Sequence, residues 1–382
     1  MDTGNKRLVL FDTSNFRNYP VGGQLTSIKG FLRYLGKDYS HKIDRILLVG
    51  VATDPQEIGR ITQIDTEAGC IHFLAVAMAP ENLNSVKKSL RVEYLKGLYK
   101  FRKIIALSAE DCVYLHTPEA YLFTHIASRK APCFVFSHGT FLNMVDHVRF
   151  FRKFKLLLKL FHNMLISIIK NSTCIFVLDR DTQRQYQKYS DNVVLVGNSI
   201  VCTPEQTMHY PDAAKPKLLF VGRLSAVKNI GPIIEAAKQY ESDCQLQIVG
   251  AGELMEELKE TANERVQFIG AVPPAEVADY MRTADILIMN SVQEGIPMAI
   301  LEAFAQSLPV ITTDVGGIGQ TVQFGINAEK TDGTAQSIVS AAHKILDKYP
   351  EYALAAYQRS LDFDYKAVNE ELFAIINRYL QW

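Results

Sequence analysis

The chain has 382 residues, of which 48% are hydrophobic, and its 41 basic residues balance its 41 acidic ones. A chain of this length and apolar content is long enough for two globular domains with sizeable cores. Because the charge is balanced, nothing in the composition indicates a nucleic-acid partner.

The cysteines are scattered and form no Cys-x-x-Cys pair, which favours buried free thiols in a reducing compartment over disulfides or a zinc site. The six are Cys70, Cys112, Cys133, Cys174, Cys202 and Cys244. The first residues lack the apolar core of a signal peptide, and no apolar stretch is long enough to span a bilayer. We therefore expect a cytoplasmic protein.

Apolar runs of strand length alternate with helix-like segments along the whole chain. The first series of predicted strands covers 8–11, 45–51, 71–76, 112–115, 133–136, 174–177 and 193–196. The second series covers 218–221, 246–249, 266–269, 286–289 and 310–313. This alternation predicts βαβ units, and therefore parallel sheets with helices on both faces.

A loop-like stretch with three prolines, 202–217, separates the two series. We expect an α/β protein with two doubly wound, Rossmann-like domains, 1–200 and 201–364, whose strand ends face each other across a cleft. The last segment, 365–382, has an amphipathic helical pattern. We expect this helix to pack back on the first domain.

In the first domain, candidate ligand contacts follow predicted strands, at the edge where α/β sheets bind ligands. Gly22 and Gly23 form a turn that opens a helix, where the backbone can approach acceptor or phosphate oxygens. In isolation such a dipeptide is most often only a turn. His116 and His138 each follow a strand, although a single histidine is more often a structural hydrogen-bonding residue than a catalyst.

Segment 149–170 combines clustered cations with a broad apolar face. A basic amphipathic helix of this kind can lie in the interface of an anionic membrane, which predicts peripheral association with the inner face of the cell membrane. The alternative is an ordinary domain helix that neighbouring elements cover on one side. The sequence leaves both open.

In the second domain, Gly222-Arg223 and Lys228 follow the first strand. An Arg fork and a Lys point charge suit a diphosphate, although two solvated surface cations would give the same pattern. Glu294 and Glu302 flank a predicted helix start after the strand 286–289. Two acceptors on either side of free helix amides match the hydroxyls and phosphate of a nucleotide sugar, but a capping Glu and a solvated Glu would share this spacing.

Taken together, residues 216–335 resemble the donor domain of family-four retaining glycosyltransferases, also called group 1 glycosyltransferases, which have the two-domain GT-B fold. The resemblance is carried by the order and spacing of several motifs. They are Gly222-Arg223 with Lys228-Asn229, Gly250-Ala251-Gly252, Phe268-Ile269-Gly270, Ala284-Asp285, Glu294 with Glu302-Ala303-Phe304-Ala305, Pro309-Val310 and Val315-Gly316-Gly317.

The resemblance implies a role for each matched position. Arg223 and Lys228 would hold the donor diphosphate and stabilise the leaving nucleotide. Glu302 would accept hydrogen bonds from the ribose hydroxyls, and Glu294 from hydroxyls of the transferred sugar. The backbone amides that would face the phosphates are those of Met298, Ala299 and Ile300.

In the first domain, the resemblance implies that His138 contacts the donor sugar near the reacting carbon, with His116 a weaker candidate. Gly22 and Gly23 would form a loop at the donor and acceptor. Two positions depart from the family pattern, because Gln320 replaces a common Glu and Asn327-Ala328 replaces an Asn-Gly turn. These departures put the local loop shape and donor preference in doubt.

Two Asp-x-Asp pairs, Asp179 with Asp181 and Asp362 with Asp364, have the spacing that a metal-dependent transferase uses to hold a cation on the diphosphate. The first lies at a strand end and helix cap, and the second in a C-terminal turn. Because Arg223 and Lys228 can neutralise the charge of the diphosphate, we interpret both pairs as structural and expect no metal or other cofactor.

The sequence thus predicts a metal-independent, retaining hexosyltransferase. It would move a hexose-type sugar from a nucleoside-diphosphate sugar, such as a UDP-sugar, to a saccharide or polyprenyl-linked acceptor in cell-surface polysaccharide biosynthesis (capsule, O-antigen or exopolysaccharide). The resemblance implies front-face attack, with the leaving phosphate assisting deprotonation of the acceptor. Two alternatives stay open: another enzyme on this fold, such as a nucleotide-sugar epimerase, and a non-catalytic nucleotide-sugar or membrane-binding module.

Overall fold

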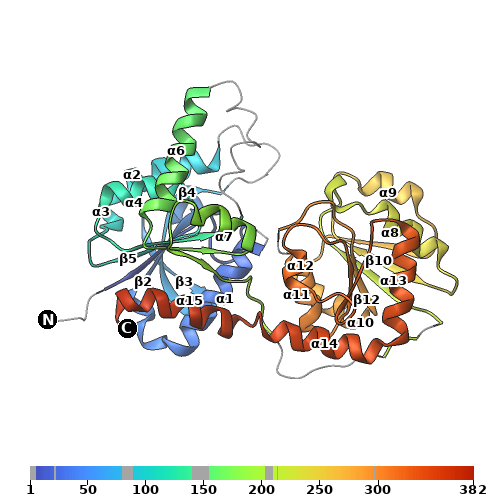
Figure 1. Ribbon diagram of the computed structural model, residues 1–382. Helices are drawn as coiled ribbons and strands as arrows, with labels where there is room; N and C mark the ends of the chain where they lie inside the picture. Colours follow the sequence, from blue (N-terminus) through green and yellow to red (C-terminus); the bar gives the residue numbers. More distant parts are fainter. Residues whose placement is uncertain are drawn as a thin grey trace. The chain divides into compact units, whose positions relative to one another are not determined.

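The computed structural model describes residues 6–20, 23–79, 89–139, 155–202, 210–212, 214–295 and 297–382, without the side chains of 155–161 and 274. The chain divides into two compact units (Figure 1). The first comprises Met1–Ser199 together with Tyr365–Trp382, and the second comprises Ile200–Asp364. This division lies one residue from the boundary expected from the sequence.

The first unit is built on an eight-stranded sheet with the order β3-β4-β2-β1-β5-β6-β7-β8. All neighbouring strands are parallel except β3 and β4, which form an antiparallel hairpin. The strands are β1 (Leu8–Phe11), β2 (Ile46–Ala52), β3 (Ile61–Thr66), β4 (Gly69–Met78), β5 (Cys112–Leu115), β6 (Cys133–Ser137), β7 (Cys174–Val177) and β8 (Val193–Leu195). The strand order runs outward from β1 in both directions, so it reverses between β1 and β5.

Helices cover both faces of this sheet. Figure 1 shows α2, α4 and α6 on one face and α1 and α15 on the other. The α-helices are α1 (Gly23–Asp38), α2 (Leu90–Lys100), α3 (Arg102–Ile105), α4 (Ala120–Ala127), α6 (Lys155–Asn171), α7 (Arg180–Gln187) and α15 (Tyr365–Leu380). Leu165, Ile168 and Ile169 of α6 are fully buried in the core cluster of the first face.

An aromatic cluster holds α15 against α1. The ring of Phe373 lies 6.1 Å from Phe31, 6.0 Å from Tyr34 and 4.6 Å from Tyr39, all in edge or tilted geometry. Trp382 closes the cluster from the end of the chain, 6.1 Å from Phe373, and its Nε1 donates to the Lys6 carbonyl over 3.2 Å. The last residues of the chain therefore belong to the core of the first unit.

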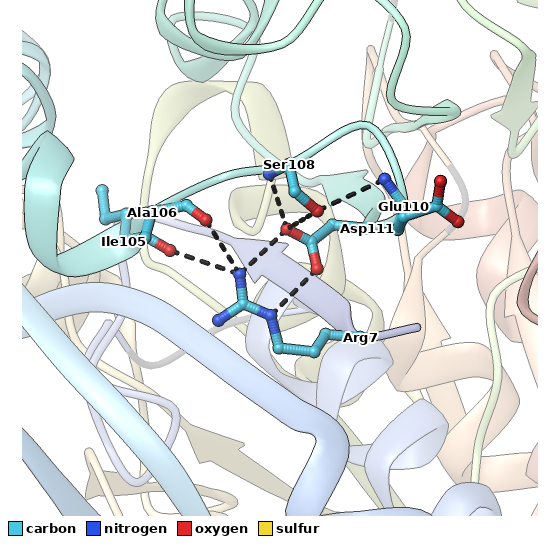
Figure 2. A network of polar contacts seen from close by, with 6 residues as sticks. All are labelled: Arg7, Ile105, Ala106, Ser108, Glu110 and Asp111. Atoms are coloured by element: carbon cyan, nitrogen blue, oxygen red, sulfur yellow. Dashed lines mark hydrogen bonds and ion pairs between the residues drawn. The ribbon is translucent and has the colours of Figure 1, made fainter. Parts of the chain in front are cut away.

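An ion pair between the partly exposed Arg7 and the buried Asp111 ties together the amino ends of β1 and β5 (Figure 2). Arg7 donates from Nε and Nη2 to the two oxygens of Asp111, each over 2.9 Å, which is the bidentate geometry of a guanidinium and a carboxylate. The same Nη2 donates to the Ala106 carbonyl over 3.1 Å, and Ser108 donates its amide to Asp111. This network lies at the edge of the sheet opposite to the strand ends that carry His116 and His138.

The second unit has a six-stranded, fully parallel sheet with the order β11-β10-β9-β12-β13-β14. Its strands are β9 (Lys217–Val221), β10 (Gln245–Val249), β11 (Val266–Gly270), β12 (Ile286–Met289), β13 (Val310–Thr312) and β14 (Ala328–Lys330). Its α-helices are α8 (Gly231–Gln239), α9 (Met255–Thr261), α10 (Pro274–Thr283), α11 (Met298–Ala305), α12 (Ile318–Thr321), α13 (Ala335–Asp347) and α14 (Tyr349–Leu361). The order reverses between β9 and β12.

The predicted strands are all present within two residues at each end, but the sequence did not predict β3 and β14. β3 is an edge strand in which one side chain, that of Ile64, is buried, so it has no apolar run. β14 has only three residues, Ala-Glu-Lys, which are too few for any periodic pattern. Within the described residues, we find no helix long and apolar enough to cross a membrane.

The aromatic cluster generates a stability prediction. Phe373→Ala removes a fully buried ring, so we expect the free energy of unfolding of the first unit to fall by about 3–5 kcal/mol. The measurement is urea unfolding followed by the fluorescence of Trp382, the single tryptophan of the chain. Val92→Ala, at an exposed position of α2, should change stability by no more than about 0.5 kcal/mol. Equal effects of the two changes would contradict the prediction.

Candidate functional site

In the second unit, the carboxyl ends of β9 and β12 separate at the point where the strand order reverses. The ladder between these strands pairs only Ile286 with Leu218 and Leu287 with Leu219. By contrast, β9 pairs with β10 as far as its last residue, Val221. Ligands of doubly wound sheets bind in the crevice at such a switch point. The loops that follow β9 and β12 are therefore the first place to look for a site.

These two loops carry Lys228 and Glu294, and the structure brings them together. Lys228 Nζ forms an ion pair with Glu294 Oε1, and Ser291 Oγ donates to the same oxygen over 2.8 Å. Both charged side chains are largely buried, with exposed fractions of 20% and 13%. Two charges that are mostly removed from water attract each other more strongly than a surface pair, but their burial is costly. A charged ligand can therefore compete with Glu294 for Lys228.

The backbone beneath Glu294 is fixed by close packing. A Cβ on Gly316, which has φ +58°, would lie 1.8 Å from the Glu294 carbonyl oxygen, so only glycine fits there. The Gly317 amide donates to the Gly295 carbonyl over 3.0 Å, and Thr313 Oγ1 donates to the Ser291 carbonyl over 2.6 Å. The glycine turn predicted after the fifth strand of this domain therefore positions the loop of Glu294.

Asn290, directly after β12, connects the start of its loop to the loop that follows β9. This fully buried residue donates from Nδ2 to the Asn229 carbonyl over 3.1 Å and to the Gly333 carbonyl over 3.0 Å. The Val292 amide donates to the Val227 carbonyl over 2.9 Å. The residues that flank Lys228 are thus hydrogen-bonded to residues that precede Glu294, which holds the ion pair in place before any ligand arrives.

The helix that starts next to this pair is α11. Its first amides lack intrahelical partners by their position, which makes the helix start attractive to an anion. Of the three amides predicted to face phosphates, that of Ile300 donates to the Pro297 carbonyl over 3.1 Å, which leaves Met298 and Ala299 as the better placed. Glu302 lies one turn further along α11. Burial raises the pKa of Glu302, and its carboxylate has no hydrogen bond or ion pair with any described residue.

Arg223 lies apart from Lys228 and Glu294. Its Nη2 contacts Glu253 Oε2 at 3.2 Å, and the two side chains are 75% and 53% exposed. An exposed pair of this kind contributes at most about 1 kcal/mol. Arg223 is therefore free to reorient toward a ligand, but the structure does not place it in contact with the other predicted site residues.

In the first unit, the predicted histidines contact each other at the carboxyl ends of β5 and β6. His116 Nδ1 lies 2.9 Å from His138 Nε2. His116 is 4% exposed, whereas His138 is half-buried. Burial lowers the pKa of His138 to about 3, and burial together with the neighbouring ring lowers that of His116 well below its usual range. Both rings are therefore neutral at physiological pH.

Asp12 and Gln24 join this cluster, although neither was a predicted site residue. Asp12 follows β1, is 1% exposed and accepts a hydrogen bond from Gln24 Nε2, which also lies 3.5 Å from the His116 carbonyl. Asp12 Oδ2 is buried without a hydrogen-bond partner among the described residues. Asp12 follows its strand just as His116 and His138 follow theirs, so the same positional rule could have identified it.

Other predicted features fall partly outside the described residues. Gly23 begins α1, but Gly22 lies outside them. Of segment 149–170, the described part is α6 from Lys155 onward, with its core contacts near the end of the helix. The membrane interpretation of this segment stays a prediction.

Aspartates of the two Asp-x-Asp pairs make hydrogen bonds or ion pairs within the protein. Asp179 caps α7 by accepting the Thr182 amide over 2.7 Å, and Asp364 Oδ2 accepts the Cys202 amide over 3.2 Å. Asp362 forms an ion pair with Arg359 at 2.7 Å. Within the described part of the chain, no group of three His, Cys, Asp or Glu residues is placed to hold a metal ion.

Comparison with known proteins identifies relatives of the second unit. Residues 215–348 match the model of a family described as glycosyl transferases group 1. The chain is 32% identical over 145 residues to the putative teichuronic acid biosynthesis glycosyltransferase TuaC of Bacillus subtilis (strain 168), which covers 37% of this chain and 36% of that protein. The match thus spans little more than a third of the length of this relative.

Solved structures resemble the whole chain. Sucrose-phosphate synthase from Thermosynechococcus elongatus has a TM-score of 0.75 at 16% identity, over 98% of this chain and 99% of that chain. The HepE protein of Anabaena, in complex with UDP, has a TM-score of 0.69 at 16% identity, over 97% and 100%. At this identity the likeness shows the fold, which is GT-B with two Rossmann-like sheets, as predicted.

Burial of Asp12 generates a prediction on pH dependence. Its pKa is raised by burial to about 6, against about 3.9 in an unfolded chain. The folded state therefore binds this proton more tightly, and the charged carboxylate destabilises the first unit above pH 6 but not below pH 4. Asp12→Asn removes this penalty, so its stability relative to the wild type should fall by about 2–3 kcal/mol between pH 8 and pH 4.

Urea unfolding at each pH, followed by Trp382 fluorescence, measures this difference. Asp65→Asn, at an exposed position of β3, serves as the control and should show a difference that changes little with pH. A difference for Asp12→Asn that is the same at pH 8 and pH 4 would contradict the assignment.

Proposed function

We propose that this chain is a group 1 glycosyl transferase, the family whose model its residues 215–348 match, and that it transfers a hexose-type sugar from a nucleoside-diphosphate sugar to a saccharide or lipid-linked acceptor. A UDP-sugar is the proposed donor, because the structurally similar HepE protein binds UDP. The proposed product is a cell-surface polysaccharide, because TuaC is a putative glycosyltransferase of teichuronic acid biosynthesis.

One observation carries the proposal. At the switch point of the second sheet, Lys228 is held by Glu294 at the start of α11. A diphosphate has the charge to replace the carboxylate on Lys228, and the first amides of α11 can receive its oxygens. Glu294 would then be released to accept hydrogen bonds from hydroxyls of the transferred sugar.

Each neighbouring group has a part in this proposal. Lys228 stabilises the charge that develops on the leaving diphosphate, where preorganised charge in a dry site is most effective. Arg223 swings from Glu253 to the same phosphates. Glu302, whose partly buried carboxylate has no described partner, accepts the ribose hydroxyls, and these hydrogen bonds replace the hydration lost on burial.

The proposal extends to the course of the reaction. We propose that transfer proceeds with retention of configuration and needs no metal, since Lys228, Arg223 and the helix start can supply the positive charge. Front-face attack with help from the leaving phosphate accounts for retention, as the family resemblance implies. His138 would contact the transferred sugar, and Gly22 and Gly23 would approach the donor and acceptor.

Donor binding tests the site directly. A nucleotide sugar at about one hundred times its dissociation constant should stabilise the protein by about 2.7 kcal/mol, which is roughly 5–10 °C in Tm. In a thermal-shift panel of nucleotide sugars, Lys228→Met should abolish the shift because it keeps the apolar stem and removes the charge. Lys259→Met, which removes a cation of α9 in the same unit, should leave the shift intact. A wild type that no nucleotide sugar stabilises would contradict the proposal.

The Lys228–Glu294 pair makes a second prediction. Glu294→Gln leaves Lys228 without its carboxylate, so a nucleoside diphosphate without sugar should bind roughly fivefold more tightly. The nucleotide sugar should not share this gain, because the variant loses the acceptor for the sugar hydroxyls. Calorimetric titration of both ligands gives the ratio of affinities, which should change by tenfold or more.

Glu253→Gln is the matched control, since it breaks the exposed pair with Arg223; any effect of freeing Arg223 on the diphosphate applies to both ligands, so the ratio of the two affinities should stay unchanged. If Glu294→Gln alters the affinity for the diphosphate and for the nucleotide sugar by the same factor, Glu294 does not contact the sugar.

A further inference from the structure

The two histidines of the first unit form a hydrogen bond whose direction has chemical consequences. His116 Nδ1 and His138 Nε2 are 2.9 Å apart. The His116 ring is stacked on Phe136 at 5.2 Å and 16° and lies 4.5 Å from Tyr114. Its second nitrogen, Nε2, is buried without a hydrogen-bond partner among the described residues. Among the described residues, His138 is the one polar contact of the His116 ring.

A neutral imidazole carries one proton, on one of its two nitrogens. If His116 donates from Nδ1, its Nε2 is an unprotonated acceptor, and His138 must carry its own proton on Nδ1. If His138 donates from Nε2, His116 must carry its proton on Nε2, inside the aromatic surroundings. His138 Nδ1 would then be an acceptor. The two arrangements give His138 opposite properties toward a ligand.

The surroundings of His116 favour the first arrangement. The second would leave a buried Nε2–H group with no acceptor among the described residues, and unpaired buried N–H groups are rarer in proteins than unpaired acceptors. Burial also keeps both rings neutral, so a doubly protonated ring does not resolve the conflict.

The backbone around His138 is already held in place. Ser137 Oγ donates to the Gly139 carbonyl over 2.6 Å and lies 3.1 Å from the hydroxyl of Tyr186. His138 is half-buried, and its Nδ1 has no hydrogen bond with any described residue. A proton on Nδ1 is thus available to a ligand at the carboxyl edge of the first sheet.

We propose that His116 is a positioning residue, which donates from Nδ1 to His138 Nε2 and so presents His138 as an Nδ1–H donor to a hydroxyl or phosphate oxygen of the nucleotide sugar. The effect on catalysis rests on the function proposed above, whereas the tautomer itself does not. The two can therefore be tested separately.

The tautomer is read from the full-length protein labelled with ¹⁵N-histidine. Long-range ¹H–¹⁵N correlation spectra distinguish protonated from unprotonated ring nitrogens, and the spectrum of His138→Gln assigns the signals of His138. We expect His138 to be protonated at Nδ1 and His116 at Nδ1 as well. A proton on Nε2 of His138 overturns the proposal, whether or not any sugar transfer is found.

Substitutions of His116 then test the consequence for activity. Asn carries its amide nitrogen on Cγ, as histidine carries Nδ1, so His116→Asn keeps a donor to His138. Gln carries its amide one bond further out, near the position of Nε2. We expect His116→Gln and His116→Leu to lower kcat roughly tenfold or more, with little change in the KM of the nucleotide sugar. His116→Asn should stay within about threefold of the wild type and keep the Nδ1–H signal of His138.

Equal losses in the Asn and Gln variants would overturn the role of the Nδ1 donor. If His116→Leu does not fold, the comparison of the Asn and Gln variants still decides. Absence of any transfer by the wild type, combined with the expected tautomer, would refute the proposed function and leave the hydrogen-bond assignment intact.

Discussion

The reversal of strand order between β9 and β12 is the constraint on which the site of the second unit depends. The helices that follow these two strands pack into different core clusters, α8 with Ile233 and Ile234 in one and α11 with Ile300 and Phe304 in the other. The loops therefore leave the sheet in opposite directions, and the ladder between the strands ends early, at Leu219 and Leu287. The topology separates the two strand ends, and Lys228 and Glu294 then place charged groups there.

The same device recurs in the first unit with different chemistry. There the order reverses between β1 and β5, and the strand ends carry Asp12 and His116. The second unit places a charged pair beside a helix start, which suits an anion. The first unit places neutral imidazoles among aromatic rings, which suits hydrogen bonding to hydroxyls rather than attraction of charge. In each unit, polar side chains converge at the carboxyl ends of the two adjacent strands between which the strand order reverses.

The sequence predicted most of the fold, because the buried parallel strands are apolar runs bounded by glycines and polar residues. It also placed Glu294 in a loop and Glu302 on a helix, since both follow from Pro297 and the preceding strand. The contact of Lys228 with Glu294 could not be predicted from the sequence, because it depends on which strands are neighbours in the sheet. Arg223 shows the same limit, since it faces Glu253 of the adjacent loop rather than Lys228.

The central claim is that a nucleoside diphosphate replaces Glu294 on Lys228 at the start of α11. The most direct measurement is a crystal structure of the full chain with UDP. We expect phosphate oxygens on Lys228 Nζ and at the amides of Met298 and Ala299, the ribose at Glu302 and an open Lys228–Glu294 contact. UDP bound elsewhere, or bound while Lys228 and Glu294 stay paired, would contradict it.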